Sequence, residues 1–533
     1  MRIKTILYTC VLTLWVCLGF DSFAQNRFMV MSDAHVLDRS LFNSSAPFEG
    51  NARLVEKSAD LFDQAIEIIS AEKPDLLLIP GDMSSDGEKV SHEYVASKLN
   101  ALVESGIKVL VVPGNHDINN PFSYNYNTEI PTPQESVSEE DFLSIYSRCG
   151  YSEAIERFGL SYLAFPCDGV AFICLDSRKP DTENVHYSEG GLTEETILWS
   201  EKMAKIARAQ GRVVFGMMHH PIMEHYDGHA EIATNYIANQ TEGYPELNIV
   251  QQRLVKAGIG VMFTGHYHLQ SVQHEIIDGK ELWDVMTGSL STYPMPMRKG
   301  VIDAEGNLSI TSELVGEWQE LGKIRNQNTT NNMFAKMART LFPKLNQKKE
   351  ELGEAYAKII SWPENENELI DGMNQYMLDS YTELINSLSI GDEEQDSPEV
   401  KYKAATNGFD DYIKSFVVGG GLLKDLIQVL LLSAVKETDE YMLLDKMNKS
   451  IFYNYKTTEE NVVADNMIDI RSISSIKIPD LNNDGIINNG DIVSMVVNIM
   501  LGIEDQNVDP TLFDFENDGV SVTDLTTIIS TLK

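Results

Sequence analysis

The chain contains the stretch Val109-Leu110-Val111-Val112-Pro113-Gly114-Asn115-His116-Asp117, in which apolar residues lead through a Pro-Gly pair into an amide, an imidazole and a carboxylate. A short run rich in β-branched residues favours a buried strand, and Pro followed by Gly favours a turn directly after it. Three side chains that can bind a metal or move a proton therefore stand at the predicted end of a strand. The Tyr-rich loop 122–126 that follows lies either along the same site or against its own domain.

Four further segments show the same arrangement of an apolar run followed by polar side chains. They are Asp33-Ala34-His35, Gly81-Asp82, His219-His220-Pro221 and Gly265-His266-Tyr267-His268, and they follow the runs 28–31, 76–79, 213–217 and 261–263. Stretches with helical spacing at 54–69, 94–103 and 193–209 separate these runs. We expect the strand ends to bring all five segments together at one edge of a sheet.

Histidines are concentrated in these segments. A single histidine is ordinarily a core or surface residue, but of the 11 histidines in the chain six fall here, and chance is a poor explanation. His225 and His229 stand in a polar loop, where a substrate contact and plain exposure are both open. His92, His186 and His274 are interpreted as structural or solvated.

The residue types fit a site for two divalent cations. Such a pair can clamp a phosphate ester, activate a water, and stabilise both the attacking and the leaving oxygen of an in-line displacement, with one carboxylate bridging the cations. The mixture of imidazoles, carboxylates and an amide oxygen suits Mn, Fe or Zn better than the all-oxygen sites of Ca or Mg. We therefore expect two divalent transition-metal ions as cofactors.

The segments, in this order, resemble the motifs of the calcineurin-like metallophosphoesterases over about residues 27–315. The resemblance implies a two-sheet α/β sandwich flanked by helices. It also implies seven metal ligands: Asp33, His35 and His268 for one metal, Asn115, His219 and His266 for the other, and Asp82 as the bridge.

The resemblance further assigns the groups around the metals. It implies that His116 stabilises or protonates the leaving oxygen, that Asp117 orients His116, and that His220 supports the ligands. Purple acid phosphatases carry a tyrosine three residues after the bridging aspartate. This chain has Ser85 at that position, which argues against an iron-tyrosinate centre.

The later sequence divides the rest of the chain. After Gly260 the pattern predicts strands at 271–277, 282–286 and 308–314, which complete a metallophosphoesterase domain over residues 25–315. Over residues 316–470, stretches rich in Leu, Met, Ala, Lys and Glu at 346–360, 366–388 and 422–436 predict an all-α region. Its role is open between capping the site, dimerisation and bracing the sandwich.

The segment 478–533 carries an independent signal. The ligand positions of a calcium loop are present around Gly485, with side-chain oxygens at most of them and a backbone carbonyl at Ile486. They are Asp480, Asn482, Asp484, Ile486, Asn488 and Asp491. A similar segment begins at Asp514, but Asp524 falls one residue early, so a plain surface turn is the alternative for this second copy. The duplication resembles a dockerin, a small calcium-binding helical domain, and implies a cohesin-like protein partner.

The N-terminus predicts export. Two basic residues precede an apolar run at 6–20 and then Ser22-Phe23-Ala24, which is the order of a secretory signal peptide cleaved after Ala24. We expect residues 1–24 to be removed and the protein to be secreted, periplasmic or at the cell surface, with no membrane span left. An uncleaved membrane anchor is the alternative.

The cysteines give no disulfide framework. After cleavage three remain, Cys149, Cys167 and Cys174, which is an odd number. Cys167 and Cys174 flank a predicted hairpin turn at Asp168-Gly169, where a disulfide and buried free thiols are both open.

Composition limits the partners, and the motifs suggest the activity. The formal net charge of −38 repels polyanions and argues against a nucleic-acid-binding surface, although solubility alone accounts for such a charge. We predict a secreted phosphoesterase in which a hydroxide held between two metals attacks a small phosphorylated substrate. The segments 81–89 and 287–290 favour small phosphodiesters.

Two alternatives to this function are kept. A phosphomonoesterase or nucleotidase would use the same ligands on a different ester. A non-catalytic metal-binding component of a surface complex, assembled through the dockerin-like tail, belongs to a different class of protein.

Overall fold

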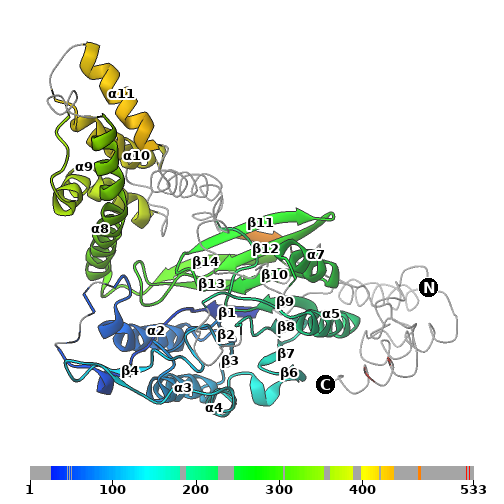
Figure 1. Cartoon of the computed structure of the whole chain (residues 1–533). Coiled ribbons are helices and arrows are strands. Elements are labelled where there is room, and N and C mark those ends of the chain that lie inside the picture. Colours follow the sequence, from blue (N-terminus) through cyan, green and yellow to red (C-terminus); the bar gives the residue numbers. More distant parts are fainter. Residues whose placement is uncertain are drawn as a thin grey trace, which may run out of the picture.

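The computed structural model describes residues 26–44, 46, 48–49, 51–179, 188–225, 245–303, 307–352, 360–387, 398–418, 422–436, 466–469, 524 and 527. Two β-sheets pack against each other with helices outside them, and a group of further helices extends beyond the sheets (Figure 1). The expected α/β class is confirmed for this part of the chain. The predicted signal peptide and calcium loop lie outside the described residues.

The first sheet has six strands. Their spatial order is β15 (Asn466–Asp469), β14 (Asn307–Leu314), β13 (Pro296–Ile302), β1 (Asn26–Val30), β2 (Leu76–Ile79) and β3 (Lys108–Val111). The strands β1, β2 and β3 run parallel, so their carboxyl ends lie at one edge, whereas β13 is antiparallel to β1.

The second sheet has seven strands. Their order is β11 (Ser271–Ile277), β12 (Lys280–Met286), β10 (Ile259–Thr264), β9 (Val213–Met217), β8 (Val170–Cys174), β7 (Ser161–Cys167) and β6 (Glu156–Phe158). The four strands β8, β9, β10 and β12 are parallel to one another. A separate small hairpin joins β4 (Tyr124–Asn125) to β5 (Thr132–Pro133).

Side-chain alternation along the strands builds two cores. In β9, Val213 and Phe215 face the core between the sheets, whereas Val214 faces α5 (Glu194–Ala209) and α7 (Leu247–Ala257) on the outer side. Successive side chains of a strand point to opposite faces, so a strand buried on both sides must be apolar throughout. This explains why the apolar runs that precede the five polar segments contain almost no polar residues.

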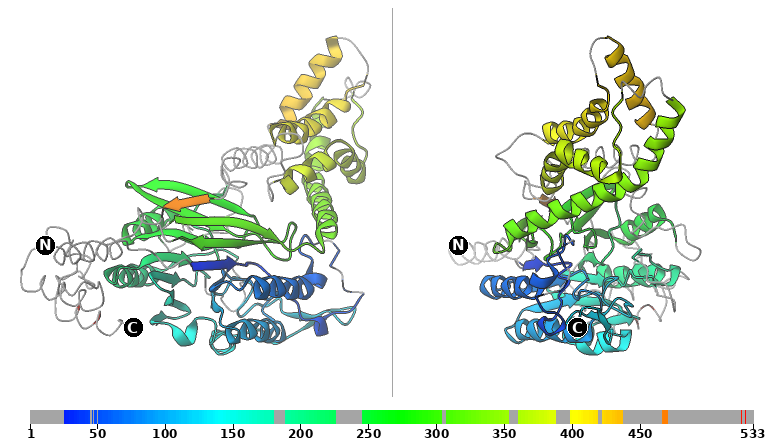
Figure 2. Two further views of the ribbon diagram at one scale, coloured as in Figure 1. Left: turned by 180° about the vertical axis from the view of Figure 1, so that it is seen from behind. Right: turned by 60° about the vertical axis from the view of Figure 1, so that its left-hand side comes forward.

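Aromatic rings join the sheets at their centre. The ring of Phe28, from β1, meets that of Phe263, from β10, edge to face at 5.4 Å between centroids. On the far side of the first sheet, α2 (Ser58–Glu72) and α3 (Lys89–Glu104) cover β1 to β3, and α4 (Glu139–Ile145) packs on α3 (Figure 2). Short 3-10 turns occur at Arg39–Leu41, Val55–Lys57 and Tyr151–Glu153.

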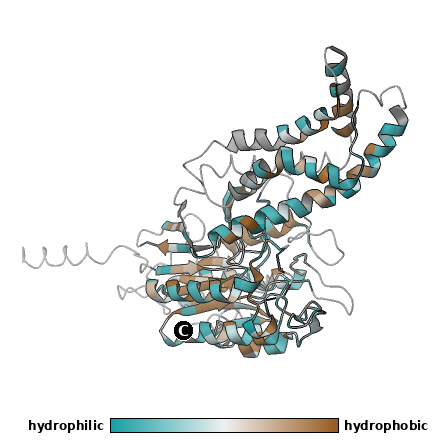
Figure 3. Cartoon of the chain, turned by 90° about the vertical axis from the view of Figure 1, so that its left-hand side faces the viewer, coloured by the Kyte–Doolittle hydropathy of each residue, from teal (hydrophilic) through white to brown (hydrophobic). Residues whose placement is uncertain are grey.

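A helical region follows the sandwich. It comprises α8 (Gln319–Leu352), α9 (Glu366–Ser387), α10 (Pro398–Ser415) and α11 (Leu422–Lys436), with a core of its own (Figure 1). Hydrophilic and hydrophobic residues alternate along these helices (Figure 3). None of the described helices is both long and apolar enough to cross a membrane.

The structure corrects several sequence-based boundaries. The helix expected at 346–360 begins at Gln319, and Ile360 forms an isolated bridge with Val417 instead. No sequence pattern predicted β13, and β15 lies inside the stretch assigned to helices although it pairs with β14 as an edge strand. Both strands are held in the sheet by pairing with strands that are distant in the sequence.

The cysteines of the β7–β8 hairpin are free thiols. Cys174 stands opposite Tyr162, and Cys167 stands opposite Val170 at the turn, so this register does not pair the two cysteines. The disulfide alternative is therefore wrong for this structure. Cys167 is only half-buried, whereas Cys149 and Cys174 are buried.

Candidate metal centre

All five polar segments follow the carboxyl ends of parallel strands. Three come from β1, β2 and β3 of the first sheet, and two from β9 and β10 of the second. Several of the residues adopt the left-handed backbone conformation that favours glycine: Asp33 (φ 50°), His35 (φ 43°), Asp82 (φ 50°), His266 (φ 78°) and His268 (φ 59°). Such strain persists only where the surroundings enforce it, and it gathers at functional sites.

The first cluster consists of Asp33, His35 and His268. The Nε2 atoms of His35 and His268 lie 2.9 Å apart, and Asp33 Oδ1 lies 3.9 Å from the first and 3.4 Å from the second. Asp33 is held by the backbone N–H of His266, which donates to its carboxylate at 3.0 Å. One carboxylate and two imidazoles therefore converge on one point.

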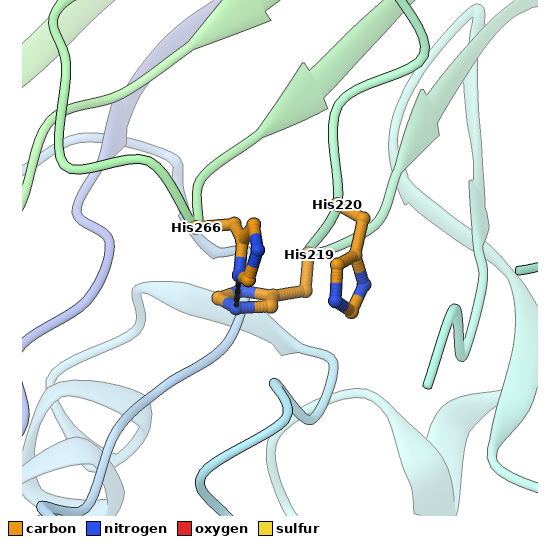
Figure 4. Close-up of side chains that lie close together, drawn as sticks. All are labelled: His219, His220 and His266. Carbon is orange, nitrogen blue, oxygen red and sulfur yellow. Dashed lines mark hydrogen bonds between the residues drawn. The ribbon is translucent and has the colours of Figure 1, made fainter. Parts of the chain in front are cut away.

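The second cluster consists of Asn115, His219 and His266. Asn115 Oδ1 lies 3.1 Å from His219 Nε2 and 3.0 Å from His266 Nδ1, and these two nitrogens are 3.2 Å apart. Figure 4 shows the rings of His219 and His266 turned toward each other. The Nδ1–H of His219 donates to the carbonyl of Pro80 at 2.8 Å, so Nε2 is the ring nitrogen that faces the cluster.

Asp82 stands between the two clusters. Its Oδ2 lies 3.6 Å from His35 Nε2 and 3.2 Å from His219 Nε2, while its Oδ1 accepts from the backbone N–H of His116 at 2.9 Å. Although burial opposes ionisation, His219 and then His116 outweigh it and hold the pKa of Asp82 well below its ordinary value. The charged carboxylate faces both clusters, as a bridging ligand must.

His116 lies beside the clusters rather than within them. Its Nδ1 is 2.8 Å from Asp86 Oδ1, and the side chain is 26% exposed, so a ligand can reach it. Burial opposes protonation, but the carboxylates of Asp82 and Asp86 outweigh it and raise the pKa of His116 above its ordinary value. The ring is thus set up to hold and deliver a proton.

Asp117 lies among backbone groups of two ligand loops, and the orienting role expected for it stays a prediction. Its carboxylate accepts from the backbone N–H of Ser84 at 3.0 Å and from that of Gly114 at 2.8 Å, and thereby ties two ligand loops together. The Asp86 carboxylate contacts the His116 ring instead. Sequence reasoning missed it, although a carboxylate in the loop that leaves the bridging Asp82 was a usable signal.

Glu88 is a buried carboxyl group behind Asp86. Its Oε2 accepts from the Asp86 backbone N–H at 3.1 Å. Burial and then the charge of Asp86 raise the pKa of Glu88 to about 8. Glu88 is therefore neutral at neutral pH, which leaves Asp86 as the charge that faces His116.

His220 lies beside the second cluster, and its supporting role stays a prediction. Its Nδ1 lies 2.8 Å from the hydroxyl of Ser177, and its Nε2 lies 3.1 Å from the carbonyl of Ser188. The ring packs against that of His266 with centroids 4.4 Å apart, to the side of the ligand pair (Figure 4). Although His220 lies close enough to His219 and His266 to count as a third donor, protein groups occupy both its ring nitrogens.

The histidines outside the ligand segments differ in their surroundings. His92 is buried and bonded to the Tyr146 hydroxyl and the Asp117 carbonyl, and His274 stacks on Trp283. His225 is fully buried and 3.3 Å from Asp284, so plain exposure is excluded for it. His186 and His229 lie outside the described residues.

Asp284 was missed by the sequence reading. Its Oδ2 accepts from the backbone N–H groups of Ile222 and Met223, and its Oδ1 accepts from the hydroxyl of Thr264. These groups belong to the two loops that carry His219 and His266. One buried carboxylate from β12 thus fixes both loops.

The donor set fits a pair of metal ions. Among the described residues, four overlapping groups of His and Asp side chains each have their donor atoms within 4.8 Å of one another. Burial first, and then neighbouring positive charge, lowers the pKa of His35 and His266 well below the ordinary value, so both rings are neutral and offer lone pairs. The mixed nitrogen and oxygen donors suit Mn, Fe or Zn. The role of each residue as a ligand stays a prediction.

Residues 26–270 match the family model of the calcineurin-like phosphoesterases. This match, over 245 of the 533 residues, together with the His and Asp clusters supports a metal-dependent phosphoester hydrolase. No curated protein matches the chain.

Several solved structures are similar to this chain at low identity. A dimetal phosphatase from Danio rerio has 15% identity and a TM-score of 0.38, with 55% of this chain and 97% of that chain covered. A purple acid phosphatase from yellow lupin (Lupinus luteus) seeds has 12% identity and a TM-score of 0.36, with coverages of 56% and 53%. GAP50, the anchor in the inner membrane complex of Plasmodium, has 11% identity and a TM-score of 0.32, with coverages of 55% and 85%.

A substitution at Gly265 tests how tightly the clusters are packed. A Cβ at this position would collide with the hydroxyl of Ser32 and the carboxylate of Asp33. We predict that Gly265→Ala displaces Asp33 and weakens metal binding on the order of 10–100-fold, as for loss of groups that hold a ligand. Gly316→Ala, where a Cβ meets open space, is the matched control. Equal metal affinity of the two variants, measured by titration calorimetry, would contradict the arrangement.

Proposed function

We propose that this protein hydrolyses phosphate esters with two divalent metal ions, and that its substrates are small phosphodiesters. The observation that carries the proposal is the position of Asp82, whose Oδ2 lies within 3.6 Å of a donor nitrogen from each cluster. A carboxylate in this position can be shared by two cations. Metal ions bound here would polarise the phosphoryl oxygens and supply a hydroxide nucleophile at neutral pH.

The protein's own groups divide the remaining work. His116 delivers a proton to the leaving oxygen, since its side chain is partly exposed and Asp86 holds its Nδ1. Asp117 and Asp284 keep the ligand loops in place through backbone contacts. A group that departs as an alkoxide needs this proton, whereas an acidic leaving group does not.

The preference for diesters rests on sequence. The segments 81–89 and 287–290 resemble those of bacterial exported and cyclic-nucleotide-type phosphodiesterases more than those of protein phosphatases. A phosphomonoesterase or nucleotidase is the second candidate, because both use the same ligand set. The non-catalytic alternative is less favoured, since every ligand position is filled by a residue able to coordinate a metal.

We also propose that the protein is exported and that its C-terminal segment binds calcium. The support is the order of basic, apolar and small residues in 1–24 and the spacing of oxygen ligands over 480–491. A cohesin-like partner would follow from the dockerin-like duplication.

Removal of the bridge tests the dinuclear site. Without the Asp82 carboxylate two cations lose their shared anion, so Asp82→Ala should lose both metal occupancy and hydrolysis of bis-p-nitrophenyl phosphate. Asp168→Ala removes an exposed carboxylate at the β7–β8 turn and should change neither. Metal analysis measures the occupancy of the site, and initial rates measure the hydrolysis. A variant that kept two metals and near-normal rates would show that Asp82 is not the bridge.

A second experiment separates chemistry from metal binding. His116→Ala should keep both metals and lose turnover by on the order of 10²–10⁴, with smaller losses for esters of acidic alcohols. Asp86→Asn should show the same dependence on the leaving group in weaker form, because it leaves the ring in place without its orienting charge. Losses independent of the leaving group would exclude the proton-donor role.

Calcium binding is measurable on the full chain. Asp484→Ala removes a ligand from the predicted loop and should lower bound calcium by one ion per chain, while hydrolysis stays unchanged because the clusters lie elsewhere. Equilibrium dialysis with labelled calcium gives the stoichiometry. If the wild type and Asp484→Ala bound the same number of calcium ions, the result would contradict the predicted calcium loop and with it the expected cohesin-like partner.

A further inference from the structure

Two tyrosines stand side by side in the β4–β5 hairpin that follows His116. Tyr124 and Tyr126 lie two residues apart in an extended stretch, so their side chains point to the same face of the hairpin. Their ring centroids are 6.4 Å apart, and both side chains are partly exposed. We call them the tyrosine pair. Neither is one of the expected metal ligands.

The tyrosine pair rests on a packed support. The Tyr126 ring meets the Phe48 ring edge to face, at 5.1 Å between centroids. Phe48 is itself buried in a small core with Leu37 and Leu41, and the backbone N–H of Tyr126 donates to the Leu41 carbonyl. Because the ring of Tyr126 is already held in one position, little conformational entropy is lost when a ligand packs on it.

The hairpin is fastened to the loops that carry the proton donor and its carboxylate partner. The Asn120 side chain donates to the His116 carbonyl at 3.1 Å and accepts from the backbone N–H of Phe122 at 2.9 Å. At the other end of the hairpin, the N–H of Val137 donates to the Gly87 carbonyl at 2.9 Å. The hairpin therefore keeps a fixed position relative to His116.

Tyr126 also approaches the site from the side of the first cluster. The chain that leaves His35 reaches it at Phe42, which forms an isolated bridge with Tyr126, and the rings of His35 and His116 are 4.8 Å apart. Burial and then the negative charge of Asp86 raise the pKa of Tyr126 to about 12. The Tyr126 hydroxyl is thus within electrostatic range of the carboxylate that holds His116. It stays protonated at neutral pH, while Asp86 disfavours an anion in front of the rings.

We propose that the tyrosine pair binds an uncharged planar ring in the leaving group of the ester, such as the base of a nucleoside or an aryl group. The inference rests on the proposed function, because His116 protonates the leaving oxygen and the pair lies on the His116 side. Aromatic side chains stack on planar rings with little regard to the substituents of those rings. The tyrosine pair therefore selects the class of leaving group and leaves the phosphoryl group to the metal centre.

Binding of adenosine tests this subsite without turnover. The wild type should bind adenosine more tightly than ribose in a ligand-observed NMR titration of the full chain, with and without added Mn. Tyr124→Ala should weaken adenosine binding on the order of 5–100-fold, as for the loss of one stacking ring, and Tyr124→Phe should keep most of it. Tyr376→Ala should change nothing. It is the matched control, because Tyr376 is 39% exposed and packs on Tyr412 at 5.4 Å between centroids, in the helical region.

Kinetics identify the part of the substrate that occupies the tyrosine pair. The KM of Tyr124→Ala should rise more for methyl p-nitrophenyl phosphate, whose leaving group is a ring, than for glycerophosphoethanolamine, whose leaving groups are alkyl alcohols. No adenosine binding by the wild type, equal adenosine binding by Tyr124→Ala, or equal rises of KM for the two esters would overturn the inference and leave the proposed function intact. A wild type that binds metals but hydrolyses neither ester would overturn the proposed function itself.

Discussion

One buried carboxylate has to face two groups of metal donors that come from different sheets. Asp82 leaves β2 of the first sheet, and its Oδ2 lies close to His35 from the same sheet and to His219 from the second. This is possible only where the carboxyl ends of β1 to β3 meet those of β9 and β10. Small residues make the approach possible, because a Cβ at Gly114 would collide with Asp82 and one at Gly81 would come within 2.6 Å of His219. The geometry of the site therefore depends directly on how the two sheets pack.

The sequence predicted the parts of the fold that local pattern encodes. The strands before the ligand segments are buried on both faces, so their apolar runs stand out, and Gly or Pro marks the turns that follow. The strand β13 escaped because Arg298, Lys299 and Gly300 interrupt it, and only its pairing with β1 and β14 makes it a strand. The ligand positions were readable for the same reason as the strands. Asp284 was not, because it acts on groups that only the tertiary fold brings near it, whereas Asp86 was overlooked although it lies in the loop that leaves Asp82.

The helical region contacts the sandwich through Arg325 of α8. Its guanidinium donates to the Phe48 carbonyl and to the Glu56 carboxylate. Because a buried arginine that satisfies a carbonyl and a carboxylate is costly to remove, this joint is expected to hold α8 against the sandwich. This contact is compatible with the bracing role considered from the sequence, which stays a prediction.

The most direct test of the account is whether two metal ions share the Asp82 carboxylate. Protein loaded with Mn(II) should bind two ions per chain and give the electron paramagnetic resonance spectrum of an exchange-coupled pair, since a bridging ligand transmits the coupling between close metal ions. A spectrum of isolated Mn(II), with one ion per chain or two uncoupled ions, would contradict a shared carboxylate and with it the dinuclear centre.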